Sequence, residues 1–145
     1  GVKTVTANTG ATTTVNANIS TLETQTYSGA LVIDENVVLS STGAGALGNI
    51  TFASTVKATA SETLTVNTAG TTRFNGVVGG TLVESPATLT TDAVGSTEIT
   101  AGNIYAANQN YNDDVILFAN TTLDALININ LQISEGLLEG LNRPG

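Results

Sequence analysis

The sequence predicts an all-β protein built as a right-handed parallel β-helix, a β-solenoid in which short coils stack along one axis. Three observations lead to this prediction. They are an internal repeat, a composition that suits extended strands and tight corners, and short alternating bursts of apolar and polar residues separated by turn residues. An antiparallel, pilin-like β-sandwich completed by a donated strand is the alternative fold.

The chain nearly repeats itself at an offset of 84 residues, with residues 12–41 matching residues 96–125. The thirty aligned positions contain six identical pairs: Thr13/Thr97, Ala17/Ala101, Gln25/Gln109, Tyr27/Tyr111, Asn36/Asn120 and Leu39/Leu123. One quarter of this offset is about 21 residues, a suitable length for one coil with three short faces. On that length the 145 residues would form about seven coils.

The composition supports strands and corners rather than helices. Thr and Val are abundant, and branching at Cβ suits a pleated backbone. Gly accounts for 15 residues, and Gly and Asn suit tight corners where φ is positive. The hydrophobic fraction of 41% is high enough to bury a core, which argues against a disordered chain.

The alternating bursts place each expected strand in order along the chain. Turn residues such as Asn8-Thr9-Gly10 and Asn75-Gly76 separate them. The expected strands are residues 3–7, 12–17, 24–27, 30–33, 37–40, 49–52, 55–58, 63–67, 71–74, 81–83, 88–90, 98–100, 109–111, 115–118 and 121–123.

Large apolar residues at similar positions in these strands are the expected interior. Phe52 and Phe74 are 22 residues apart, about one coil, so we expect them to lie above one another in neighbouring rungs. The full set of core candidates is Tyr27, Phe52, Phe74, Tyr111, Leu39 and Leu123.

The tail differs from the repeats, so the chain divides into a solenoid region, 1–125, and a terminal segment, 126–145. Residues 126–133 alternate strictly and predict an amphipathic strand, and residues 134–141 predict a weak helix or cap. The strand either closes the last coil or pairs with a neighbouring copy to make a fibre. The candidates for contact between subunits are Leu126, Ile127, Ile129, Leu131 and Ile133.

The charge balance restricts the partners. Twelve acidic and four basic residues give a net charge of −8, which repels nucleic acid and anionic lipid. No apolar run reaches the length of a membrane span. The absence of Cys fits a reducing cytosol or a secreted protein, and the Thr- and Asn-rich, Lys-poor composition favours secretion. The chain begins Gly1-Val2-Lys3 without a signal-peptide pattern, and the repeat favours a piece of something longer.

Catalytic and metal chemistry have few candidate residues. Without Cys or His, the common nucleophile–base pairs and zinc sites cannot be built. Asp113-Asp114 and Asp34-Glu35 are adjacent acidic pairs, and adjacent strand residues point to opposite faces. We expect Asp113-Asp114 to be a solvated turn rather than a calcium site, although its oxygens suit calcium. The sequence therefore predicts a protein that is not an enzyme and uses no cofactor.

Three segments resemble a known type of repeat. They are residues 64–80 (LTVNTAGTTRFNGVVGG), 87–93 (ATLTTDA) and 109–115 (QNYNDDV). Together they resemble the tandem β-strand repeats of very large secreted bacterial proteins of the filamentous-haemagglutinin-like kind. The resemblance covers most of residues 12–125 and implies a secreted, non-catalytic scaffold at a surface or in a matrix. Arg73, residues 82–86 and the tail depart from the pattern, which suggests a diverged or terminal copy.

The function that these observations predict is a structural module of an extracellular bacterial surface or fibre protein, acting in assembly and adhesion. Its expected partners are copies of itself, joined head to tail or by edge strands, or adjacent repeats of the same chain. Cell-surface glycans are a further candidate partner. Two alternatives stay open: a pilin-like subunit that polymerises by donor-strand exchange, and a carbohydrate-binding or carbohydrate-cleaving β-helix.

Overall fold

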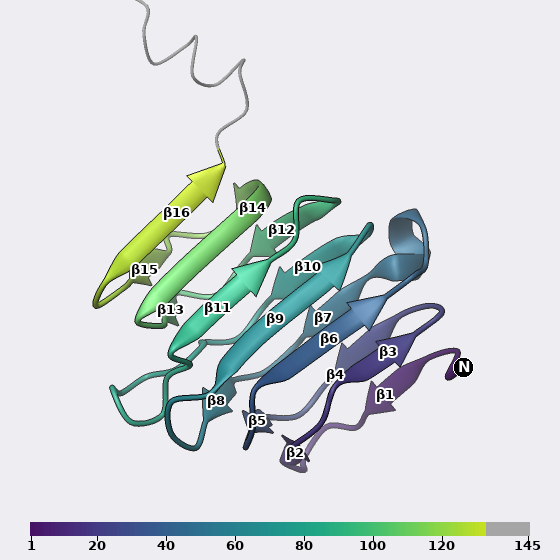
Figure 1. Ribbon diagram of the computed structural model, residues 1–145, viewed down its shortest axis with the longest axis horizontal. Coiled ribbons are helices and arrows are strands. Elements are labelled where there is room, and N and C mark those ends of the chain that lie inside the picture. Colours follow the sequence, from purple (N-terminus) through teal and green to yellow (C-terminus); the bar gives the residue numbers. More distant parts are fainter. Residues whose placement is uncertain (133–145) are drawn as a thin grey trace, which may run out of the picture.

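A computed structural model of the chain describes residues 1–132 as a parallel β-helix with three faces (Figure 1). Every strand pair in this part of the chain is parallel, which excludes the antiparallel sandwich. The chain passes along each face in turn and returns one rung higher. Figure 1 shows the rungs following the sequence, from the purple N-terminal end to the yellow β16.

The first face holds six rungs in register. Its strands are β1 (Val5–Ala7), β4 (Gln25–Tyr27), β7 (Ile50–Phe52), β10 (Thr71–Phe74), β12 (Ser96–Ile99) and the second half of β14 (Asn108–Leu117).

The second face is the most irregular. Its strands are β2 (Thr13–Val15), β5 (Leu31–Ile33), β8 (Val56–Ala58), β13 (Asn103–Tyr105) and β15 (Thr122–Asp124). Between β8 and β13 a single residue, Val78, bridges both neighbouring rungs.

The third face also holds six rungs, and its central strands lie side by side at the front of Figure 1. They are β3 (Ile19–Thr21), β6 (Val37–Ser41), β9 (Thr63–Thr68), β11 (Thr88–Thr91), the first half of β14, and β16 (Asn128–Gln132). A short 3-10 helix, η1 (Gly45–Gly48), fills the corner before β7.

The coils vary in length, and residues 1–132 form six of them. On the first face the paired residues Val5–Gln25, Gln25–Ile50, Ile50–Thr72, Thr72–Thr97 and Thr97–Val115 are 20, 25, 22, 25 and 18 residues apart. The uniform coil of about 21 residues, and the count of about seven coils derived from it, do not describe this part of the chain. The corners absorb the difference, because loops of different length can join strands that stay in register.

The 84-residue repeat crosses from one face to another. Gln25 and Tyr27 lie on the first face, whereas Gln109 and Tyr111 lie on the third. The offset is therefore one face short of four whole coils. Strand order survives the offset, but the repeated residues do not stack in one column.

The interior is a set of columns, each made of one inward residue per rung. Tyr27, Phe52 and Phe74 form one such column on the first face, and Ile99 and Leu117 continue it. Inward residues alternate with exposed or half-buried ones, since successive side chains of a strand point to opposite sides. The column residues and their counterparts on the other faces make one contiguous apolar core.

Three strand assignments differ from the sequence expectation. Residues 81–83 lie in a loop, not a strand, because Gly79 and Gly80 take positive φ and Pro86 follows. Strands β3 and β13 form where no strand was expected. Each is only three residues long and is specified by the rung beside it rather than by a local pattern.

Candidate functional site

The core candidates lie as follows. Tyr27, Phe52, Phe74, Leu39 and Tyr111 are buried, with at most 1% of each residue exposed. Leu123 is partly buried and packs against the core. Phe52 and Phe74 are paired residues of neighbouring rungs. Tyr111 lies on another face from Tyr27, so it does not join the aromatic column.

The repeated Gln-x-Tyr motif forms the same contacts in both places. The Tyr27 hydroxyl donates to Gln25 Oε1 and the Tyr111 hydroxyl to Gln109 Oε1, each at 2.8 Å. Gln25 Nε2 donates to the carbonyl oxygen of Ser40 at 2.8 Å, and Gln109 Nε2 to that of Asp124 at 2.9 Å.

In both motifs the bonded carbonyl lies 15 residues after the glutamine. The motif thus ties its own rung to the next passage of the chain. Burial raises the pKa of both tyrosine hydroxyls, which keeps them protonated as donors. These residues are structural in both copies.

The acidic pair Asp113-Asp114 is not a solvated turn. Asp113 is only 4% exposed and lies where β14 bends from the third face to the first. It accepts hydrogen bonds from Thr91 Oγ1 at 2.7 Å and from Thr97 Oγ1 at 2.9 Å, while Asp114 is exposed. Burial raises the pKa of Asp113, and the two threonine hydroxyls oppose that rise. The carboxylate joins two faces at a corner.

The last rung carries an apolar surface at the end of the solenoid. Leu117, Ile129 and Leu131 are the last members of three inward columns, and 50%, 40% and 43% of their surface is exposed. Phe118, Leu126 and Ile127 lie at the corners of the same rung and are also exposed. We call these six residues the terminal surface. Four of the expected contact residues belong to it, and the fifth, Ile133, lies outside the described residues.

Backbone edges accompany this apolar surface. Within residues 1–132, β16 pairs only with β14, and β15 pairs only with β13. The outer edges of these strands therefore leave N–H and C=O groups directed along the solenoid axis. At the other end, Val2 bridges to Thr21 and is exposed, and Val5 and Ile19 of the first rung are half-buried.

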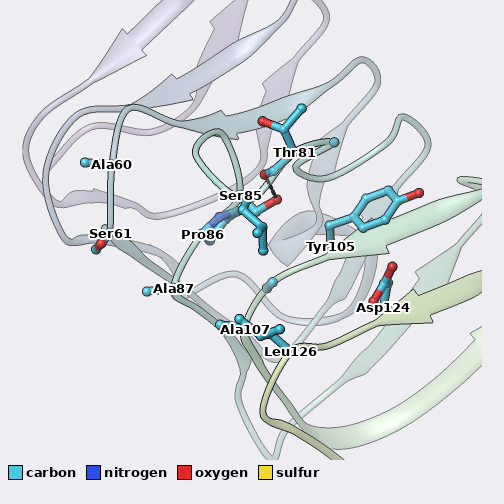
Figure 2. Close-up of a pocket in the computed structure, with 13 residues that line it drawn as sticks. Ala60, Ser61, Thr81, Ser85, Pro86, Ala87, Tyr105, Ala107, Asp124 and Leu126 are labelled. Atoms are coloured by element: carbon cyan, nitrogen blue, oxygen red, sulfur yellow. Dashed lines mark hydrogen bonds between the residues drawn. The ribbon is translucent and has the colours of Figure 1, made fainter.

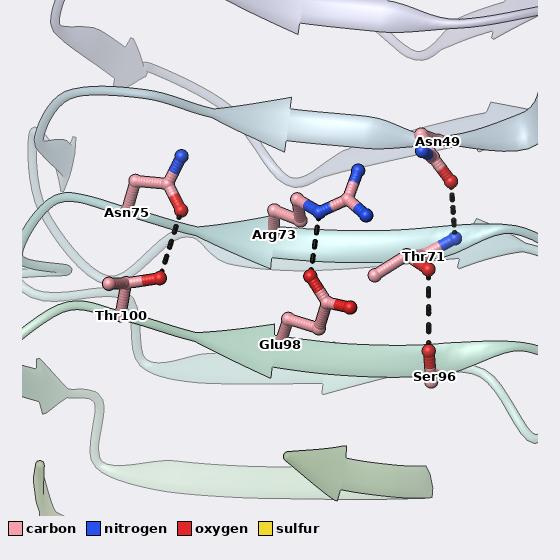
Figure 3. A network of polar contacts seen from close by, with 7 residues as sticks. All are labelled: Asn49, Thr71, Arg73, Asn75, Ser96, Glu98 and Thr100. Atoms are coloured by element: carbon pink, nitrogen blue, oxygen red, sulfur yellow. Dashed lines mark hydrogen bonds and ion pairs between the residues drawn. The ribbon is translucent and has the colours of Figure 1, made fainter. Parts of the chain in front are cut away.

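The sides of the solenoid are polar and paired across rungs. On the first face the outward row includes Thr71 Oγ1 at 3.4 Å from Ser96 Oγ and Arg73 Nε at 2.7 Å from Glu98 Oε2 (Figure 3). Thr100 Oγ1 donates to Asn75 Oδ1 at 3.2 Å in the same row.

On the third face Asn130 Nδ2 donates to Asn110 Oδ1 at 2.6 Å. These pairs satisfy one another between neighbouring rungs. The sides therefore differ in kind from the terminal surface.

One cavity of about 510 Å³ lies beside the second face, between the loop of residues 79–86 and strands β13 and β15 (Figure 2). The sequence did not indicate it, because the loop was expected to contain a strand. Within residues 1–132 no three acidic, His or Cys side chains lie together as metal ligands. No helix in this part of the chain is long and apolar enough to cross a bilayer.

No protein-family model, curated protein or solved structure matches the chain.

Proposed function

We propose that this protein is a non-catalytic structural module of an extracellular bacterial surface or fibre protein, and that it assembles by stacking its ends on further coils. The observation that carries the proposal is the terminal surface, where the interior columns end in exposed Leu117, Ile129 and Leu131. Burying one such side chain contributes roughly 1.5–3 kcal/mol relative to leaving it exposed.

The geometry restricts what can cover this surface. A parallel rung extends a solenoid only if its strands run in the same direction and its inward residues meet the columns below. The first rung of a second copy offers half-buried Val5 and Ile19 in parallel strands at the opposite end of the molecule. The contact joins unlike ends, so it repeats without closing and produces a rod.

The sides support the same proposal in a different way. Their polar pairs, such as Arg73–Glu98 and Asn110–Asn130, are already satisfied between rungs. Growth by lateral packing would have to replace these contacts with others of similar strength. Stacking at the ends buries apolar area without that cost. The outer Thr and Asn residues stay available for adhesive contacts along the rod.

Sedimentation velocity and electron microscopy over a wide concentration range test the assembly. The unmodified chain should form thin rods that lengthen with concentration. Leu117→Lys places a charge on the terminal surface and Val2→Lys places one at the opposite end, so each variant alone should stay monomeric. Because each variant keeps one intact end, an equimolar mixture of the two should form dimers and stop there.

Leu47→Lys is the matched control, since Leu47 is similarly exposed at 57% but lies in η1 on a corner. It should form rods like the unmodified chain. Monomers at every concentration for the unmodified chain would overturn the proposal. So would equal loss of assembly in the Leu47→Lys variant, because the terminal surface would then have no special role.

A further inference from the structure

The cavity beside the second face is shaped by a loop that is held in place. Gly79 has φ +73°, and a Cβ there would clash with the Ser85 side chain and the Tyr105 carbonyl. Ser85 Oγ donates to the carbonyl oxygen of Thr81 at 2.6 Å, and Lys57 Nζ lies 3.1 Å from Glu84 Oε1. These contacts attach the loop to the coil below, so the wall of the cavity is preformed.

The floor and one side of the cavity come from two neighbouring rungs. Tyr105 in β13 and Asp124 in β15 are paired residues, so their Cα atoms are about 4.8 Å apart. Both side chains point outward on the second face, and Figure 2 shows the Tyr105 ring and the Asp124 carboxylate next to one another at the cavity. An aromatic ring and a carboxylate therefore border the same space.

The rest of the lining is mainly apolar. Leu82 and Pro86 come from the loop, Leu126 follows β15, and small residues such as Ala107 complete the wall. Leu82 and Leu126 are strongly exposed at 79% and 70%. A ligand with an apolar body would cover them and gain free energy in proportion to the area removed from water.

Asp124 has no basic partner among residues 1–132. The three basic side chains in this range are each paired with a glutamate, as Lys3–Glu23, Lys57–Glu84 and Arg73–Glu98. The net charge of the whole chain is −8, which attracts cations to the surface and repels anions. The cavity is thus a site whose charge favours a positive ligand.

We propose that this cavity binds a small organic cation, an ammonium group that carries methyl or alkyl substituents. The positive group would lie against the face of the Tyr105 ring and beside the Asp124 carboxylate, where cation–π attraction and charge attraction act together. The alkyl part would pack on Leu82, Pro86 and Leu126. A neutral sugar would leave these apolar walls poorly covered, and an anion would face Asp124. This binding is independent of end-to-end assembly.

The test uses choline and its uncharged isostere dimethylbutanol, titrated into isotopically labelled protein and followed by NMR. The full chain with Leu117→Lys serves as the background, so that assembly does not interfere. Choline should shift the resonances of Tyr105 and Ala107, and dimethylbutanol should bind at least about tenfold more weakly because it lacks the charge. Added salt should weaken choline binding and leave the isostere unchanged.

Three variants separate the contributions. Asp124→Asn should weaken choline binding by about tenfold or more, since it removes the charge but keeps the size of the side chain. Tyr105→Leu should weaken it by about two- to fivefold, the usual effect of one exposed cation–π contact. Glu35→Gln removes one negative charge from an exposed position on another coil and should leave binding unchanged. All three positions are exposed or half-buried, so folding should be retained.

Equal affinity for choline and dimethylbutanol would overturn the proposal, because charge would then play no part. So would equal weakening by Asp124→Asn and Glu35→Gln, which would assign the effect to overall charge. Binding of neutral oligosaccharides at Tyr105 without any response to choline would also overturn it and would identify the cavity as a sugar site. These outcomes leave the assembly proposal unaffected.

Discussion

The rings of Phe52 and Phe74 stack face to face with their centroids 5.0 Å apart and their planes 6° apart. Tyr27 extends the stack on the other side, 5.5 Å from Phe52. The separation is close to the spacing of hydrogen-bonded strands, so the side chains repeat at the period of the backbone. This column shows that the coils are in register at their centre even though their lengths differ.

Truncating the column should destabilise the whole solenoid. Phe74→Ala removes a fully buried ring that packs on Phe52, and the expected loss in unfolding free energy is about 3–5 kcal/mol. Urea unfolding followed by circular dichroism measures it. Leu47→Ala, at an exposed corner, should change stability by no more than about 0.5 kcal/mol. Similar losses for both variants would contradict the stacked core.

A buried hydroxyl next to this column should be removable with a gain in stability. Thr72 Oγ1 is fully buried and has no hydrogen-bond partner within the described residues. Leaving such a group buried costs about 1–3 kcal/mol, so Thr72→Val should stabilise the protein by about 1 kcal/mol.

Thr97, one rung higher, is the matched control because its hydroxyl donates to Asp113. Thr97→Val should therefore destabilise the protein by about 1–3 kcal/mol. Thermal and urea unfolding compare the two variants directly. A stabilised Thr97→Val variant, or a strongly destabilised Thr72→Val variant, would show that the two hydroxyls have been assigned the wrong roles.

The two Gln-x-Tyr motifs should respond alike although they lie on different faces. Tyr27→Phe and Tyr111→Phe each remove one hydroxyl donor to a glutamine oxygen, at an expected cost of about 1–3 kcal/mol because the oxygen is left buried and unpaired. Chemical unfolding of both variants gives the comparison. A cost at only one position would mean that the repeat preserves sequence without preserving its contacts.

Asp113 should make the protein less stable as the pH rises. Burial raises the pKa of this carboxyl group in the folded state above its value in the unfolded chain, so the fold binds the proton more tightly. Its contribution to stability is fully present below the unfolded pKa and is lost as the pH rises through the folded pKa.

Asp113→Asn should remove this part of the pH dependence and should raise the unfolding free energy at neutral pH relative to acid. Urea unfolding at a series of pH values measures both effects. Asp114→Asn is the control, since Asp114 is exposed at the next position and should leave the pH profile unchanged. A profile that stays the same in Asp113→Asn would contradict a raised pKa at that position.

Two results of the sequence analysis agree with the structure because they depend on local physical chemistry. Parallel solenoid strands follow from β-branched residues that alternate with apolar ones, and from Gly and Asn at the corners. The stacking of Phe52 on Phe74 follows from a spacing of 22 residues, which is one coil in that part of the chain. Both are properties of short segments or of neighbouring ones.

Other features depend on contacts between segments that no local pattern records. The burial of Asp113 arises because β14 bends there and brings Thr91 and Thr97 to the same corner. Strand β13 forms because Val78 and β15 lie on either side of it. The cavity at Tyr105 exists because a loop, rather than a strand, follows Gly80.

The amino-acid sequence by itself determined the fold class, the alternation that divides inside from outside, and the pairing of adjacent aromatic rungs. Only the tertiary structure decided the number of coils, the shift of the repeat from one face to another, and the groups that meet at the corners and ends. The reason is that hydrogen bonding and alternation specify a strand within a few residues. Loop length, in contrast, is free to vary, so the position of each strand around the axis is settled only when all the coils stack.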